Sequence, residues 1–243
     1  PRSSQRPWSD LGAVEGLLTF RGNPTRSWYG KGPVPDQPAV QWSVDIGCSQ
    51  SAVGSESKVW CGTGWTGQPA VFRSPVTNQW TLAFGAYNRA VNFLDPATGD
   101  EANKVPLEGG IWFSRPLVLD QLDIDGQPTP GHQELWVGTS AEKRGFLNRV
   151  DVDTGEVKTF TNNAGVGTNP ALTANGLIVA GNDAGELFAI GRQSLGESWR
   201  HGYAQATQIK GSPVVHGDEV IFGTHDKQLI AVSSVTGDEL WRF

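Results

Sequence analysis

The sequence repeats one pattern four times, and this repetition constrains the fold more than any other feature. Each copy opens with a proline and an apolar run; these prolines are Pro69, Pro116, Pro170 and Pro213. Each copy closes with a turn in which a glycine precedes an acidic residue, at Gly99, Gly155, Gly196 and Gly237. The last three of these glycines are 41 residues apart, and an Asp-rich insertion within 119–135 lengthens the first interval. Such a period predicts a row of similar structural units.

Each unit is predicted to contain four short β-strands. In the last unit, β-branched and apolar runs cover 212–216, 219–223, 228–233 and 239–243, with polar turn residues between them. No amphipathic helical pattern of useful length follows Gly16. Four-stranded units of about 40 residues are typical of β-propeller blades, so the predicted fold class is all-β.

Two residue types in these units have predicted structural roles. The four repeated glycines are expected to adopt positive φ in the turn between the third and fourth strands, where a side chain would be strained. Trp199 and Trp241, which follow this turn, are expected to pack between neighbouring units.

Composition excludes several classes of protein. The chain has 243 residues, 10 Trp and 37% hydrophobic residues, which is enough to bury a sizeable core, so disorder is not expected. No apolar run is long enough for a membrane helix. A net charge of −6 with scattered basic residues predicts no nucleic-acid binding. The chain begins at Pro1 and contains no Met, which is expected of a processed form or of a piece of a longer product.

Several segments resemble the repeat of the pyrroloquinoline-quinone-like (quinoprotein-like) β-propellers. They are Gly211-Ser212-Pro213-Val214-Val215, Asn182-Asp183-Ala184-Gly185-Glu186 and Thr236-Gly237-Asp238-Glu239-Leu240-Trp241. Phe20-Arg21-Gly22-Asn23-Pro24-Thr25-Arg26 is similar to the lead-in segment of bacterial members. The segment 60–69 resembles a feature of an uncharacterised secreted bacterial subgroup.

The resemblance implies a ring of seven or eight four-stranded blades, of which four full blades are visible here. We expect residues 1–46 to form a lead-in segment with a first outer strand, and residues 47–243 to form the blades. The units lie near 60–107, 110–162, 165–203 and 208–243. Truncation of a larger propeller, a compact four-bladed ring and a five-bladed arrangement remain open alternatives, and an incomplete ring would self-associate through its open ends.

The resemblance also implies a cofactor site, which this sequence matches poorly. Quinoprotein dehydrogenases of this fold hold pyrroloquinoline quinone (PQQ) over a Trp, cap it with a disulfide between adjacent cysteines, place Ca²⁺ on acidic and amide ligands, and use an Asp base. The only cysteines here, Cys48 and Cys61, are not adjacent, so bound PQQ is not expected. Their spacing predicts a disulfide, and two buried free thiols are the alternative.

The inserted loop is a candidate calcium site. Asp123 and Asp125 alternate with other residues before Gly126, which is how calcium loops gather oxygen ligands around a sharp turn, and Asp120 or Glu134 is a further candidate ligand. The match is incomplete, because Gln121 and His132 stand where the first and twelfth loop positions would be. A solvated acidic turn is the alternative. The four histidines have no metal-binding spacing.

A candidate ligand site follows from propeller geometry. First strands line the central channel, so residues just before the repeated prolines should converge at one rim. The candidates are Trp65, Gln68, Trp112, Arg115, Thr168, Asn169, Lys210 and Ser212. Such a mixture of polar, aromatic and cationic groups suits an anionic or saccharide ligand. The alternative is that these groups only satisfy strand ends and hold water.

These observations favour a non-catalytic, extracytoplasmic propeller, periplasmic or extracellular, that binds a protein or saccharide or serves as a scaffold. One alternative is a PQQ- and Ca²⁺-dependent dehydrogenase acting on alcohols or sugars, with part of its site outside this chain. Another is the assembly-factor role of outer-membrane lipoprotein propellers with a similar repeat, which needs a lipidated N-terminal Cys.

Overall fold

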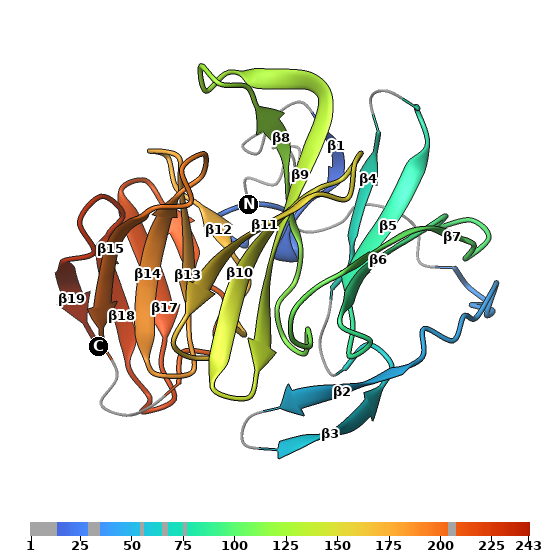
Figure 1. The fold of residues 1–243 in the computed structure, drawn as a ribbon. Helices are drawn as coiled ribbons and strands as arrows, with labels where there is room; N and C mark the ends of the chain where they lie inside the picture. Colours follow the sequence, from blue (N-terminus) through green and yellow to red (C-terminus); the bar gives the residue numbers. More distant parts are fainter. Residues whose placement is uncertain (1–13, 29–34, 54–55, 65–67, 75–76, 204–207) are drawn as a thin grey trace.

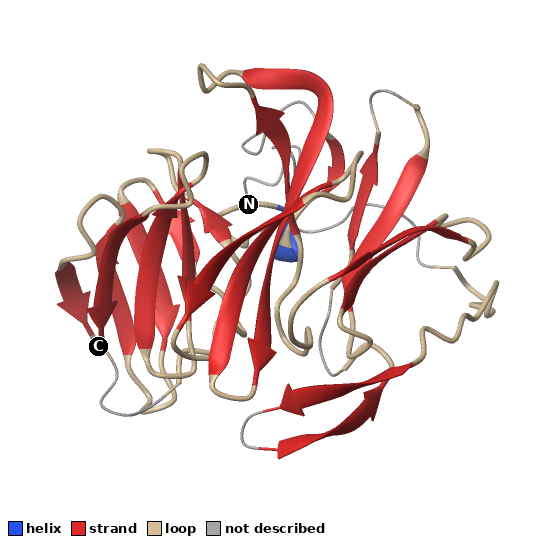
Figure 2. Ribbon diagram, viewed as in Figure 1, coloured by secondary structure: helices blue, strands red, loops and turns tan. Residues whose placement is uncertain are grey.

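The computed structural model describes residues 14–28, 35–53, 56–64, 68–74, 77–203 and 208–243. Within these residues the regular structure is β-strand apart from one short 3-10 helix, η1 (Phe20–Gly22). Four antiparallel sheets stand side by side (Figure 2), and they follow one another in chain order (Figure 1). None of the described helices has the length and apolar character needed to cross a membrane.

The sheets, here numbered I to IV, each follow one repeat. Sheet I contains β1 (Glu15–Leu17), β4 (Ala70–Arg73), β5 (Trp80–Gly85), β6 (Ala90–Leu94) and β7 (Glu101–Pro106). Sheet II contains β8 (Leu117–Leu122), β9 (Pro128–Ala141), β10 (Arg144–Asp151) and β11 (Val157–Asn162). Sheet III contains β12 (Ala171–Leu172), β13 (Leu177–Gly181), β14 (Glu186–Gly191) and β15 (Glu197–Gly202). Sheet IV contains β16 (Val214–His216), β17 (Glu219–Gly223), β18 (Leu229–Ser233) and β19 (Glu239–Arg242).

This architecture confirms the predicted all-β fold of four-stranded antiparallel units. In sheet IV, each strand lies within the run predicted for it and starts or ends at most two residues inside it. Sheet I differs from the prediction because β1 adds a fifth strand beside β4. The sequence predicts a first outer strand in the lead-in segment, but residues 41–45 of this segment lie outside the assigned strands. A separate hairpin, β2 (Cys48–Val53) with β3 (Glu56–Cys61), lies below the sheets in Figure 1.

The core lies between neighbouring sheets. Each sheet contributes one large side chain that is almost fully buried: Phe72, Trp136, Phe188 and Phe222. One apolar cluster joins sheets I, II and III, and a second joins sheets III and IV. Removing these side chains from water stabilises the stack, at roughly 25 cal/mol per Å² of apolar surface. Each sheet therefore depends on its neighbours, as expected of a repeat protein.

The turn glycines behave as predicted in three sheets and not in the fourth. Gly99, Gly155 and Gly237 have φ of 80°, 74° and 78°. In sheet III the positive φ, 55°, belongs to Leu195, so the prediction for Gly196 is wrong. The amide of Leu195 donates to Gly191 O, as that of Gly155 donates to Asp151 O. Leu195 thus takes a conformation that costs an L-residue about 1 kcal/mol, while its side chain packs against the core.

The two predicted inter-sheet tryptophans also differ. Trp199 on β15 is 7% exposed, and its Nε1 donates to Ser234 O of sheet IV at 3.2 Å, which confirms its packing role. Trp241 on β19 is 38% exposed, so the same prediction is wrong for it in this structure. The reason is that no further sheet among the described residues covers the other side of sheet IV.

Candidate functional site

The first strands of the sheets meet on one segment near the start of the chain, residues 14–28, here called the inner segment (Figure 1). Its strand β1 pairs with β4 of sheet I. The amide of Val118 in sheet II donates to Leu18 O at 2.8 Å, and that of Val215 in sheet IV donates to Pro24 O at 3.0 Å. The inner segment therefore forms hydrogen bonds with backbone groups of the first strands. Without it, these strands would border a channel.

Arg26 is the most buried basic residue of this segment, with 6% of its surface exposed. Its guanidinium donates to Pro170 O at 3.1 Å and to Pro213 O at 3.3 Å. It also donates to Thr19 Oγ1 at 2.5 Å and to Phe20 O at 3.0 Å. Two of the repeated prolines thus present their carbonyl groups to one side chain, which ties sheets III and IV to the inner segment.

All of these acceptors are neutral oxygens, so the charge of Arg26 has no counter-ion in these contacts. Burial, with the nearby charge of Arg115 as the smaller cause, lowers the pKa of Arg26 to about 9. The guanidinium is still charged at neutral pH. The inner region therefore holds two neighbouring positive charges.

Four of the predicted rim residues, one from each repeat, meet the inner segment or one another. Gln68 Oε1 accepts from Arg21 N at 3.1 Å, and the Arg115 guanidinium lies over the Phe20 ring at 4.2 Å from its centroid. The backbone amide of Arg115 donates to Asn169 Oδ1 at 2.7 Å. Asn169 Nδ2 in turn donates to Ser212 Oγ. These contacts bring together predicted residues from all four sheets. The partners of these residues are other groups of the protein.

Lys210 and Trp112 form a second cluster at this end of the sheets. Lys210 Nζ lies 4.0 Å from the Trp112 ring centroid and forms an ion pair with Asp183. Trp112 Nε1 donates to Ser140 Oγ at 3.1 Å. Burial lowers the pKa of Lys210, and the Asp183 carboxylate offsets part of that shift. Thr168 Oγ1 is bonded to Gly181 O at 3.1 Å, as expected of a group that satisfies a strand end. Trp65 lies outside the described residues.

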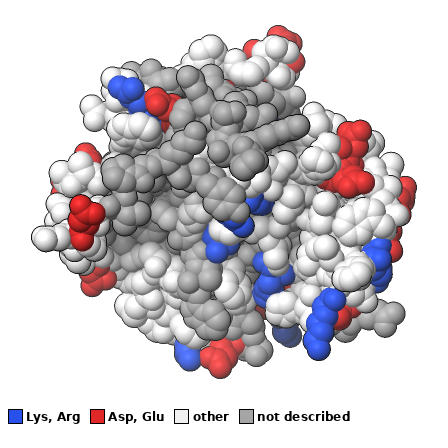
Figure 3. Space-filling view, turned by 180° about the vertical axis from the view of Figure 1, so that it is seen from behind, with Lys and Arg blue, Asp and Glu red and all other residues white. Residues whose placement is uncertain are grey.

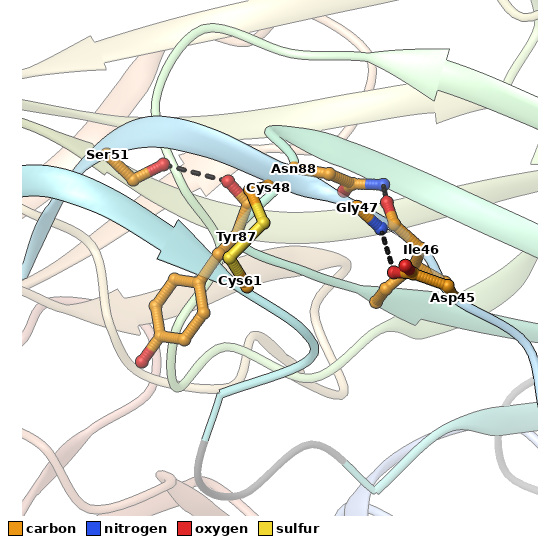
Figure 4. The surroundings of a disulfide bond; sticks show 8 residues. All are labelled: Asp45, Ile46, Gly47, Cys48, Ser51, Cys61, Tyr87 and Asn88. Atoms are coloured by element: carbon orange, nitrogen blue, oxygen red, sulfur yellow. Dashed lines mark hydrogen bonds between the residues drawn. A yellow bond between two sulfur atoms is a disulfide. The ribbon is translucent and has the colours of Figure 1, made fainter.

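The β2–β3 hairpin carries the predicted disulfide. Cys48 and Cys61 are paired across the hairpin and joined by an S–S bond. Figure 4 shows this bond beside Tyr87, whose carbonyl accepts from Ser51 Oγ at 2.9 Å. The Tyr87 ring stacks on Trp60 with centroids 5.5 Å apart. The hairpin is therefore docked on the β5–β6 connection of sheet I.

Two hollows that the sequence did not predict lie beside this hairpin. An open cleft of about 290 Å³ has polar walls, formed in part by Gln50, Ser57, Arg89, Glu108, Lys143 and Arg144. A larger groove of about 490 Å³ has mostly apolar walls, including Trp42, Val44, Ile46, Leu82, Phe84 and Leu94. The repeat pattern gives no signal for either, because their walls come from the connecting segments and one sheet face.

The candidate calcium ligands do not gather around one point. Asp123 Oδ1 accepts the amides of Asp125 and Gln127 at 2.9 and 2.8 Å, which closes the turn. Glu134 is 2% exposed and pairs with Arg192 at 2.5 Å. Asp120 is 8% exposed. The described residues include no group of three or more His, Cys, Asp or Glu side chains placed to hold a metal ion. Calcium binding thus stays a prediction, and no chemistry is derived from it.

The residues also fit the quinone cofactor poorly. The disulfide joins cysteines 13 positions apart in an exposed hairpin, whereas the resemblance implies a disulfide between adjacent cysteines. Arg26 and the inner segment occupy hydrogen-bonding groups of the first strands that would border a channel. No step through a quinone is therefore derived.

Comparisons with known proteins agree with the fold. Residues 143–243 match the sequence model of a family described as "Outer membrane protein assembly factor BamB". Among solved structures, BamB from Moraxella catarrhalis is 14% identical, with 81% of this chain and 70% of that chain covered and a TM-score of 0.48. The quinohemoprotein alcohol dehydrogenase ADHIIG from Pseudomonas putida HK5 is 13% identical, with a TM-score of 0.58. That match covers 94% of this chain and 40% of the dehydrogenase chain. No curated protein matches.

At 13% identity the match to the quinohemoprotein alcohol dehydrogenase is informative about the fold alone. The family match is confined to sheets III and IV with part of sheet II, and those sheets have the geometry that the repeated segments predicted. Residues 143–243 are therefore similar to the repeats of that family, and the chain has a fold like that of the quinohemoprotein alcohol dehydrogenase.

Proposed function

We propose that this protein is a non-catalytic β-propeller that binds a protein partner outside the cytoplasm. The binding surface would be the end of the sheets that carries the β2–β3 hairpin, Trp112, Arg115 and Lys210, here called the loop face. The observation that carries the proposal is that Arg26 and the inner segment tie together the first strands of the sheets. The inner region is thus used for structure, while the polar cleft beside the hairpin stays open.

A protein partner is favoured over a saccharide by the family match, whose description names an assembly factor. Assembly factors act by contacting other proteins, and rigid scaffolds commonly present their binding residues on connecting loops. The disulfide supports a location outside the reducing cytoplasm.

Site-directed photo-cross-linking in cells that produce the protein would test this proposal. A photoreactive residue replaces Lys143, which lines the cleft in the β9–β10 turn. The control position is Asn175, in the β12–β13 turn at the opposite end of the sheets. We expect one discrete protein adduct from position 143 and none from position 175. Equal labelling at both positions, or none at 143, would contradict the proposed surface.

A second measurement addresses catalysis. The purified protein is mixed with PQQ and Ca²⁺ and assayed for dye-linked oxidation of alcohols and sugars. We expect no turnover above that of the protein without quinone. Saturable turnover would replace the binding role with that of a quinoprotein dehydrogenase.

A further inference from the structure

We propose that the Arg115 guanidinium is a receptor for a carboxylate group. Its charged group makes no hydrogen bond or ion pair with any described residue. It lies over the Phe20 ring in a cation–π contact. The Nε atom is buried and has no acceptor within the described part of the chain. A guanidinium offers five donors in a rigid planar fork, so this side chain presents unused donors in a fixed orientation. The inference deepens the proposed function, because Arg115 lies on the loop face.

Three other half-buried bases have a carboxylate partner, whereas Arg149 donates to the carbonyl of Arg192. Arg192 pairs with Glu134 at 2.5 Å, Arg200 pairs with Glu186 at 2.8 Å, and Lys210 pairs with Asp183. Arg115 has no such partner among the described residues. A partly desolvated cation without a counter-charge is unfavourable. An external anion at Arg115 would therefore form the same kind of favourable ion pair that these internal carboxylates form.

The electrostatic surroundings of Arg115 point the same way. Arg26 lies close enough for the two positive charges to repel each other. Its own donors already reach four protein oxygens. Figure 3 shows basic side chains in the middle and also near the edge of the face turned away in Figure 1, while acidic ones lie mostly near its edge. An anion arriving at Arg115 would therefore relieve repulsion without displacing an internal salt bridge.

The shape of the donor set favours a carboxylate over a tetrahedral anion. One planar guanidinium matches the two oxygens of one carboxylate through a pair of parallel hydrogen bonds. The Phe20 ring lies against one side of the guanidinium, which limits its rotation. Gln68 Oε1 accepts from the amide of Arg21, the residue that follows Phe20. The carboxylate could belong to an acidic side chain or chain end of the partner, or to a small free acid.

Arginine-selective NMR of the full chain would test the site. The Arg115 Nε–H signal is assigned by its loss in Arg115→Lys and followed during titration with acetate, N-acetylglycine, phosphate and neutral acetamide. We expect a saturable shift with the two carboxylates and none with acetamide. Arg115→Gln should weaken carboxylate binding, followed by calorimetry, by about tenfold or more, which is the loss of a charge-assisted hydrogen bond. Arg73→Gln, at an exposed ion pair with Glu15 away from the polar cleft, is the matched control and should bind unchanged.

The ligands in this titration distinguish a peptide carboxylate from a small acid, and the variants show whether Arg115 is the receptor. Tighter binding of N-acetylglycine than of acetate assigns the carboxylate to a peptide, and equal binding assigns it to a small acid. Tighter binding of phosphate, no saturable shift with carboxylates, or equal losses in Arg115→Gln and Arg73→Gln would overturn the proposal. Circular dichroism of each variant checks folding, and Arg115→Lys keeps the charge if Arg115→Gln unfolds. A saturable acetate shift without cross-links at position 143 would contradict the proposed function and leave the carboxylate site standing.

Discussion

The indole ring of Trp199 occupies the space in which a side chain at Gly237 would stand. A Cβ atom added to Gly237 would lie 2.6 Å from Trp199 Cε3, and Trp199 Nε1 donates to Ser234 O, three residues before this glycine. Trp42 repeats the relationship on sheet I: a Cβ on Gly99 would lie 2.6 Å from its Cε3, and its Nε1 donates to Pro96 O. In these two turns the glycine both permits the positive φ and makes room for an indole.

Gly237→Ala should therefore destabilise the protein more than another positive-φ glycine does. Gly217 is the matched control, since its φ is 59° and an added Cβ would meet nothing within 4 Å. We expect Gly217→Ala to lower the free energy of unfolding by about 1 kcal/mol, the cost of the left-handed conformation. Gly237→Ala should cost roughly 2 kcal/mol more because Trp199 must move. Urea unfolding measures both free energies. Equal losses would show that the packing of Trp199 does not depend on the absence of a side chain at residue 237.

Arg26→Leu should be among the most destabilising substitutions of a basic residue. It leaves the buried carbonyls of Pro170 and Pro213 without a donor, at about 1–3 kcal/mol for each unsatisfied group. Arg144→Leu removes an exposed ion pair and should change the free energy of unfolding by less than about 1 kcal/mol. Chemical unfolding of both variants checks this. Similar losses would mean that the inner segment does not hold sheets III and IV together.

Reducing the Cys48–Cys61 disulfide should loosen the β2–β3 hairpin and leave the sheets folded. The bond closes a loop with a sequence separation of 13, which corresponds to about 3 kcal/mol in the chain-entropy model. The sheets bury their own core, so the loss should concentrate in the hairpin and its contact with Tyr87. Hydrogen exchange of Cys48→Ser/Cys61→Ser should rise at 48–61 by far more than at β13 and β14. A uniform rise throughout the chain would contradict this local role.

Asp151 should contribute to stability in a defined pH range. Burial raises its pKa, but hydrogen bonds outweigh burial and bring it below the ordinary value; the donors, strongest first, are Thr154, Gln121 and Asp153. A carboxyl group with a lower pKa in the folded state stabilises the protein above its unfolded pKa of about 3.9. That contribution is lost as the pH falls through the folded value.

Asp151→Asn should therefore reduce the difference in unfolding free energy between pH 6 and pH 2. Asp125→Asn is a suitable control, since Asp125 lies on an exposed turn. An unchanged pH dependence in Asp151→Asn would contradict the assignment.

Much of the fold followed from local sequence. The strands of sheet IV and the turns at Gly99, Gly155 and Gly237 depend on residues close in the chain. The prediction failed at Gly196, where Gly-Glu resembles the Gly155-Glu156 pair but stands one residue later in the turn. Hydrogen bonding decides the register: Gly191 N donates to Gly196 O, which puts Leu195 at the left-handed position.

The candidate site was predictable only in part. Spacing before the repeated prolines indicated that Gln68, Arg115 and Asn169 share one end of the sheets. It gave no sign that the Phe20 ring lies against Arg115, or that the amide of Arg21 reaches Gln68. Contacts between a lead-in segment and a distant repeat have no periodic signature in sequence.

By itself, the sequence determined the units of this protein, because strand alternation, turn glycines and repeated prolines act within a few residues of one another. The tertiary structure decided what fills the space between the units. Arg26 reaches carbonyl groups 144 and 187 residues away, and it remains buried only because packing of the sheets aims those groups at one point. The same packing left Arg115 without a carboxylate partner among the described residues, since charge pairing depends on which side chains the stacked sheets bring within reach.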